Sequence, residues 1–100
     1  MEPNASPAPK RGGPPFNPGS GTNADILRCV ARREATGDRS WVNAIAAATE
    51  RNPGQVHPAL GRLIREGYLT QTRETDVPNP RSFYELTDLA RDLLARIGTR

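Results

Sequence analysis

One segment in the middle of the chain carries polar side chains suited to reading DNA bases. Gln55, His57 and Arg62 fall away from the apolar stripe of a helix expected over residues 53–66. Glutamine can pair with adenine, and arginine with guanine, through two hydrogen bonds each. Base contacts usually arise near the N-terminal end of a helix in the major groove, which is where Gln55 and His57 stand. The pattern therefore predicts a helix that contacts DNA.

Three further arginines are candidates for holding the DNA backbone. Arg65 follows on the same helix, and Arg73 and Arg81 flank the tip of a predicted hairpin. Arginine contacts to phosphate position a protein on the duplex without reading its sequence. The alternative for the helix is an ordinary solvated face. The alternative for the two hairpin arginines is ion pairing with Glu74 or Asp76.

The start of another expected helix, at Ser40, adds a candidate phosphate contact. Free N–H groups at a helix N-terminus can hold an anion. The neighbouring Trp41 is expected to pack within the protein rather than to bind DNA. The full set of residues predicted to contact DNA is Ser40, Asn52, Gln55, His57, Pro58, Arg62, Arg65, Arg73 and Arg81.

Catalytic and metal chemistry find little support in the residue types. The chain has one cysteine and one histidine, whereas a structural zinc needs four ligands. There is no paired-carboxylate constellation, nucleophile elbow or glycine-rich phosphate loop. We therefore expect no enzyme activity, no metal and no cofactor. Cys29 has arginines nearby that could lower its pKa and make it a redox sensor, but a small core residue is the commoner explanation.

The charge balance permits nucleic acid as a partner without requiring it. The 100 residues hold 14 Lys and Arg against 11 Asp and Glu, a formal net charge of +3. No apolar run approaches the roughly 20 residues that span a bilayer. The N-terminus lacks the apolar region of a secretory signal. These features predict a cytoplasmic protein with no membrane partner.

Composition divides the chain into a tail and a domain. Residues 1–22 hold six of the ten prolines and four of the nine glycines, with little apolar content. Such a segment cannot bury enough apolar surface to offset its ordering entropy, so we predict a disordered tail. A basic arm that touches DNA through Lys10 and Arg11 is the alternative. Residues 23–100 hold the remaining apolar residues and form the expected domain.

Hydrophobic periodicity predicts three helices before the chain changes character. The first covers residues 24–35, capped by Thr22 or Asn23, with Asp25 in its first turn. The second covers residues 41–50, with Ser40 as its N-cap. The third covers residues 53–66, and its Asn-Pro-Gly-Gln start at residues 52–55 matches a capping box with proline at the first helical position.

After Gly67, the expected left-handed end of the third helix, the apolar period becomes that of a strand. Strands are predicted over residues 68–74 and 82–86, joined by a long tip. A fourth helix follows over residues 88–97, capped by Thr87 and ended by Gly98. Its apolar stripe is Leu86, Leu89, Ala90, Leu93, Leu94 and Ile97.

The order of elements, α-α-α-β-β-α, predicts a mostly helical α+β domain with a β-hairpin. Two helices joined by a tight turn and followed by a hairpin describe a winged helix-turn-helix. In that fold the third helix, residues 53–66, enters the major groove and the hairpin, residues 68–86, forms the wing.

Two runs resemble the PadR family of transcriptional regulators. Val-His-Pro-Ala-Leu-Gly-Arg-Leu at residues 56–63, followed by Glu-Gly-Tyr-Leu at 66–69, is similar to that family's segment from recognition helix to strand. Arg-Ser-Phe-Tyr-Glu-Leu-Thr at residues 81–87 resembles its wing strand. His57 stands where the family usually has tyrosine. The resemblance implies a homodimer on double-stranded DNA, and it leaves any small-molecule effector unidentified.

The sequence thus predicts a sequence-specific DNA-binding transcriptional regulator, a repressor that occupies a promoter. A winged helix used for protein–protein binding is the alternative from another class, because the charge of residues 23–100 is only +2. A DNA-binding accessory protein of a plasmid or replication system is a further alternative with the same contacts.

Overall fold

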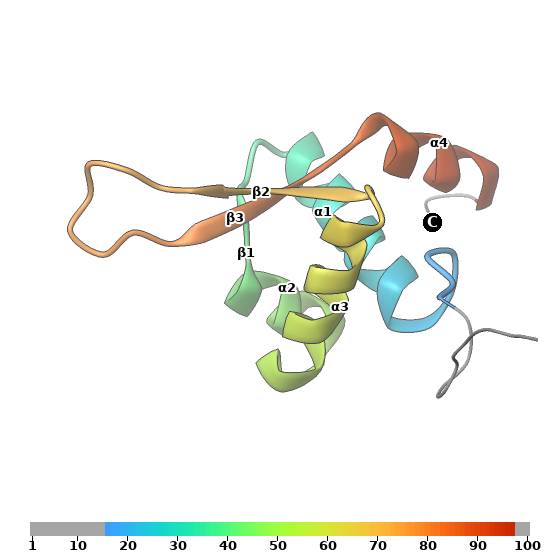
Figure 1. Cartoon of the computed structure of the whole chain (residues 1–100), viewed down its shortest axis with the longest axis horizontal. Helices are drawn as coiled ribbons and strands as arrows, with labels where there is room; N and C mark the ends of the chain where they lie inside the picture. Colours follow the sequence, from blue (N-terminus) through green and yellow to red (C-terminus); the bar gives the residue numbers. More distant parts are fainter. Residues whose placement is uncertain (1–15, 98–100) are drawn as a thin grey trace, which may run out of the picture.

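The structure, a computed structural model, describes residues 16–97. The elements in chain order are α1 (Gly21–Ala35), β1 (Ser40–Trp41), α2 (Val42–Thr49), α3 (Pro53–Arg65), β2 (Leu69–Arg73), β3 (Ser82–Leu86) and α4 (Asp88–Ile97). Figure 1 shows the β2–β3 hairpin projecting from one side of the helices, with α4 toward the opposite end. The predicted winged helix-turn-helix fold is confirmed.

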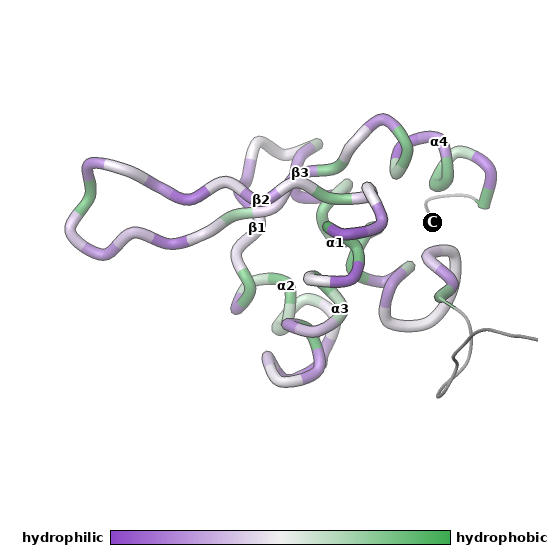
Figure 2. Tube along the Cα trace, viewed as in Figure 1, coloured by the Kyte–Doolittle hydropathy of each residue, from purple (hydrophilic) through white to green (hydrophobic). Residues whose placement is uncertain are grey.

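One hydrophobic core joins the helices to the inner face of the sheet. Figure 2 shows hydrophobic and hydrophilic residues alternating along the helices. The largest fully buried apolar side chains include Ile26, Leu27, Val30, Ile45, Val56, Leu60, Leu63 and Leu69. They come from α1, α2, α3 and β2, so the core fixes α3 relative to the hairpin.

The capping box predicted for α3 is present. The Asn52 side chain accepts a hydrogen bond from the Gln55 N–H at 3.0 Å, and the Gln55 side chain accepts one from the Asn52 N–H at 3.3 Å. Pro53 occupies the first turn, where its missing N–H leaves no bond unmade. Gly67, with φ of 89°, turns the chain from α3 into β2 as predicted.

Replacing Asn52 with alanine is expected to lower the free energy of unfolding by about 0.5–2 kcal/mol, because the N–H of Gln55 loses its acceptor. Urea denaturation followed by circular dichroism measures the loss. Asn52→Asp is the matched control, since aspartate keeps the acceptor and should stay close to the wild type. Equal losses in both variants would contradict the capping role.

The prediction that Ser40 caps the second helix is wrong. Ser40 and Trp41 form a short strand, β1, that pairs with Tyr84 and Phe83 of β3 and completes a three-stranded sheet. Helix α2 begins at Val42, with Trp41 as its N-cap. A two-residue strand is too short to show a period of two, so the sequence pattern did not reveal it.

The start of α1 also differs from the prediction. The helix begins at Gly21, so Asp25 lies beyond its first turn. The side chain of Asn17 accepts a hydrogen bond from the Gly19 N–H at 2.9 Å, and Phe16 packs against the core. Phe16 therefore packs against the domain, and residues 21–22 belong to α1. Residues 1–15 of the expected tail lie outside the described residues, and their disorder stays a prediction.

Helix α4 spans the predicted residues but buries fewer of them than predicted. Ala90, Leu93 and Leu94 are buried, whereas Leu89 and Ile97 are 45% and 38% exposed. The apolar stripe is therefore wider than the surface of α1 and β3 that it packs against. The Thr87 hydroxyl accepts a hydrogen bond from the Ala90 N–H at 3.3 Å, which confirms the predicted cap. Gly98 lies outside the described residues.

Candidate nucleic-acid interface

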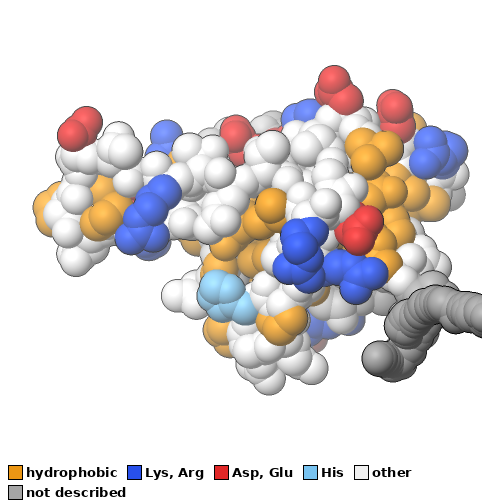
Figure 3. Space-filling view, in the orientation of Figure 1, with side chains coloured by type: hydrophobic (Ala, Val, Ile, Leu, Met, Phe, Trp, Pro, Cys, Tyr) orange, Lys and Arg blue, Asp and Glu red, His pale blue; other side chains and the backbone are white. Residues whose placement is uncertain are grey.

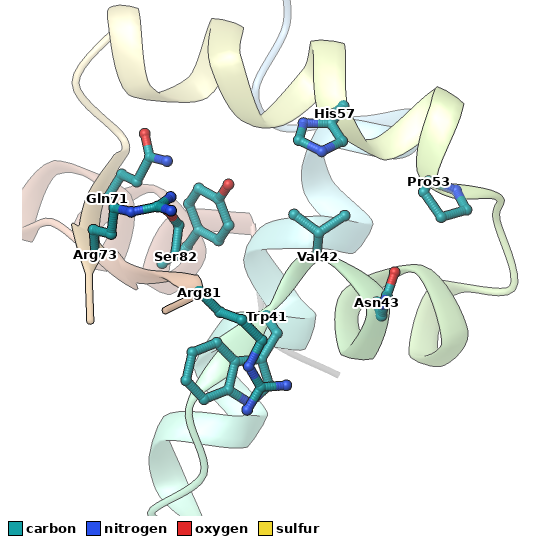
Figure 4. Close-up of a pocket in the computed structure, with 10 residues that line it drawn as sticks. Trp41, Val42, Asn43, Pro53, His57, Gln71, Arg73, Arg81 and Ser82 are labelled. Atoms are coloured by element: carbon teal, nitrogen blue, oxygen red, sulfur yellow. The ribbon is translucent and has the colours of Figure 1, made fainter. Parts of the chain in front are cut away.

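A groove separates the N-terminal half of α3 from the hairpin. We call it the wing groove; its volume is about 460 Å³, and its polar lining includes His57, Gln71, Arg73, Arg81 and Ser82. His57 enters from α3, while the other four come from β2, β3 and the residue before β3 (Figure 4). Trp41 and Asn43, at the start of α2, line its other edge. The groove brings together three residues that the sequence predicts to contact DNA.

The pairing of the hairpin explains why β2 aims its side chains at α3. Leu69 pairs with Leu86, Gln71 with Tyr84 and Arg73 with Ser82. Side chains two residues apart lie on the same face of a strand. Leu69 is buried in the core, so Gln71 and Arg73 continue that face outward beyond the core. The hairpin thereby places an amide and a guanidinium opposite α3.

The charge of the wing groove is entirely positive. Its lining contains Arg73 and Arg81 and no aspartate or glutamate. Within residues 16–97 neither arginine side chain forms an ion pair. Glu74, the expected alternative partner, pairs instead with Arg39 at 3.4 Å. Positive charge left uncompensated in a groove favours a polyanion such as a nucleic acid backbone.

Arg62 and Arg65 lie on α3 outside the wing groove. The Arg62 Nε lies 3.2 Å from Glu66 Oε2, and its guanidinium stacks 4.7 Å from the centre of the Phe16 ring. Arg65 extends over Gly61, where a Cβ would lie 3.6 Å from its Nη1. Both arginines are exposed. Figure 3 shows arginine side chains and the histidine on one face that spans α3 and the hairpin.

The remaining predicted residues differ in their availability to a ligand. Asn52 and Gln55 are exposed at the start of α3, where they hold each other in the cap, and Pro58 is exposed nearby. Ser40 is only 1% exposed, and its hydroxyl has no hydrogen-bond partner among the described residues. The predicted phosphate contact at Ser40 is therefore corrected: its side chain lies in the protein interior.

Seven of the ten residues that line the wing groove were not among the predicted DNA contacts, and the polar or aromatic ones include Trp41, Asn43, Gln71 and Ser82. Gln71 could have been found, because it stands two residues before Arg73 and strand alternation places both on one face. Trp41 and Asn43 could not, because they reach the groove only through the pairing of β1 with β3.

Cys29 lies in the core rather than at a reactive surface site. It is 1% exposed, and burial raises the pKa of its thiol, with Arg32 and Arg33 opposing that shift to a smaller extent. A raised pKa keeps the thiol protonated and unreactive at neutral pH. These observations favour the packing role of Cys29 over the redox-sensor alternative.

The native Cys29 thiol is expected to react with iodoacetamide far more slowly than the same thiol in urea, because burial limits both access and thiolate formation. Quenched mass spectrometry measures the two rates. Because the folded pKa is raised, stability is expected to fall as pH rises above the ordinary thiol value of 9.0. Equal rates of alkylation with and without urea would contradict the buried placement.

Two kinds of feature are absent from the described part of the chain. Among residues 16–97, no helix combines the length and apolar character needed to cross a membrane. In the same residues, no group of three or more histidine, cysteine or acidic side chains could hold a metal ion.

The fold is similar to that of solved structures, one of which is named a repressor. The adhesin competence repressor AdcR of Streptococcus pyogenes matches with a TM-score of 0.65 and 22% identity, over 78% of this chain and 54% of that one. ZitR of Lactococcus lactis matches with a TM-score of 0.63 and 23% identity, over 75% of this chain and 47% of that one. The chain thus spans about half the length of these structures. No protein-family model and no curated protein matches the sequence.

Proposed function

We propose that the protein is a sequence-specific regulator of transcription that binds double-stranded DNA. The observation that carries this proposal is the wing groove: it lies beside α3, it is lined by two arginines without ion pairs, and it contains no carboxylate. Phosphate contacts supply much of the affinity of DNA-binding proteins. A repressor role, by occupation of a promoter, follows the printed name of one structural neighbour.

The geometry supports different roles for α3 and the wing: α3 contacts bases, and the wing contacts the DNA backbone. Helix α3 enters the major groove, where Gln55, His57 and Arg62 contact base edges. Arg73 and Arg81 contact the backbone from the wing, and Arg65 contacts it from the end of α3. In this arrangement the wing groove faces the sugar–phosphate chain that borders the major groove.

The proposal includes an assembly and a family. A homodimer would place two α3 helices one helical turn apart on a palindromic site. The motifs at residues 56–63 and 81–87 favour the PadR family among winged-helix regulators. Sedimentation velocity at micromolar protein concentration, with and without a duplex, tests the dimer.

Fluorescence anisotropy tests the proposed function. A labelled duplex from the region upstream of the protein's own gene is compared with a scrambled duplex of equal length at 50 and 200 mM salt. We expect tighter binding to the upstream duplex and a loss of affinity in the higher salt, because bound phosphates release counterions.

Two outcomes would redirect the assignment. Absence of binding to both duplexes at micromolar protein would contradict the proposal and favour a protein-binding winged helix. Equal binding to both duplexes would contradict sequence specificity and favour an accessory DNA-binding protein.

A further inference from the structure

The arginine at the mouth of the wing groove rests on an aromatic ring. The guanidinium carbon of Arg81 lies 3.9 Å from the centre of the Trp41 ring. Trp41 in turn meets Phe83 edge-on, with ring centres 5.7 Å apart and planes at 80°. Trp41 and Phe83 are paired residues of β1 and β3, and this pairing holds the two rings next to each other. The guanidinium therefore lies on a surface held in place by the backbone of the sheet.

The backbone of Arg81 is also held on both sides. Its carbonyl accepts a hydrogen bond from the Glu74 N–H at 2.9 Å, and its N–H donates to Glu74 Oε1 at 3.3 Å. The carboxylate of Glu74 is at the same time paired with Arg39, which stacks 4.5 Å from the Phe83 ring. Glu74 thus bonds to the main chain of Arg81, while the negative charge of the Glu74 carboxylate is paired with Arg39.

Stacking has a defined consequence for a guanidinium. The flat face of Arg81 is covered by the indole, while the N–H groups lie in the plane of the guanidinium and are left for another partner. That edge matches two oxygens of a phosphate group. Figure 4 shows Arg81 extended along Trp41 at one edge of the wing groove, with His57 entering from α3 at another.

We propose that Trp41 is a positioning residue for DNA: it holds the Arg81 guanidinium in the orientation that binds a backbone phosphate. This inference rests on the proposed function. Its first part, the stack itself, exists without DNA and is tested without it. Trp41 is the only tryptophan of the chain, so its fluorescence reports on this one position.

The stack is tested first in the free protein. Removing the guanidinium in Arg81→Ala is expected to uncover the indole and raise the acrylamide quenching of Trp41 fluorescence. Arg96→Ala, which removes an exposed arginine of α4, is the matched control and should leave the quenching unchanged. An unchanged quenching constant in Arg81→Ala would overturn the proposal whether or not the protein binds DNA.

The positioning role is tested by a double-mutant cycle on duplex binding. Trp41→Leu is expected to weaken binding about threefold, because the unstacked Arg81 side chain must lose conformational freedom when it binds phosphate. Arg81→Ala should weaken binding further and reduce the slope of log K against log salt by about one unit. The double variant should bind as Arg81→Ala does, because Trp41 acts through Arg81. Trp41→Phe should restore part of the lost affinity.

Two results on DNA would overturn the positioning role. One is a Trp41→Leu effect that persists in full in the Arg81→Ala background, because the indole would then act on its own. The other is a melting temperature of Trp41→Leu so low that the unfolded fraction of the variant accounts for its whole loss of affinity. The effect would then come from unfolding. If the stack is present and no variant or wild type binds DNA, the proposed function fails and the positioning role fails with it.

Discussion

Leu60→Ala is expected to lower the free energy of unfolding by about 2–5 kcal/mol, the largest effect on stability predicted for this chain. Leu60 is 1% exposed and lies in the core on α3, the helix proposed to read bases. The truncation removes apolar contacts and leaves a cavity that the surrounding helices fill only in part. A small domain has a total stability of about 5–15 kcal/mol, so the variant should be close to unfolding.

Urea denaturation at low temperature, followed by circular dichroism, measures this loss. Leu89→Ala is the matched control, because Leu89 belongs to the same residue type and is 45% exposed on α4. Leu89→Ala should change the free energy of unfolding by no more than about 0.5 kcal/mol, as expected for a surface substitution. A Leu60→Ala midpoint equal to that of the control would contradict the register of α3 in the core.

Arg62→Ala is expected to cause the largest loss of binding selectivity. Arginine bound to a guanine edge through two hydrogen bonds contributes about 1–3 kcal/mol of discrimination. The ratio of affinities for the upstream and scrambled duplexes should therefore fall by about 5- to 150-fold. Anisotropy titrations of both duplexes at one salt concentration measure this ratio.

Two companion variants separate base reading from charge. Arg62→Lys keeps the charge and loses the flat pair of donors, so its selectivity should fall nearly as far as that of alanine. Glu66→Gln removes the ion-pair partner of Arg62 and should preserve selectivity, because that exposed pair contributes little. If Arg62→Ala weakens both duplexes by the same factor, Arg62 contacts phosphate rather than a base.

Local signals in the sequence were sufficient for most of the fold. The capping box at Asn52 and the left-handed Gly67 mark the ends of α3, and both act through residues close in sequence. The start of α1 was missed because Phe16 and Asn17 lie in a segment whose proline and glycine content resembles a linker. The Phe16 ring packs against the core, although the composition of its segment predicts disorder.

The site was less predictable than the fold because it is assembled from distant segments. His57 and Arg73 could be proposed from their positions in a helix and a strand. The strand β1, which brings Trp41 to Arg81, depends on pairing across more than forty residues and leaves no periodic pattern. The same pairing buries Ser40, which is why Ser40 does not cap α2 as predicted.

The most direct test of a DNA-binding face is amide chemical-shift mapping of the ¹⁵N-labelled protein during titration with a duplex. We expect the largest shifts at the start of α3 and on the wing, at His57, Gln71 and Arg73, and we expect these shifts to diminish in higher salt. Shifts concentrated instead between α1 and α4, around Glu34 and Leu94, would show that the wing groove is not the DNA-binding face.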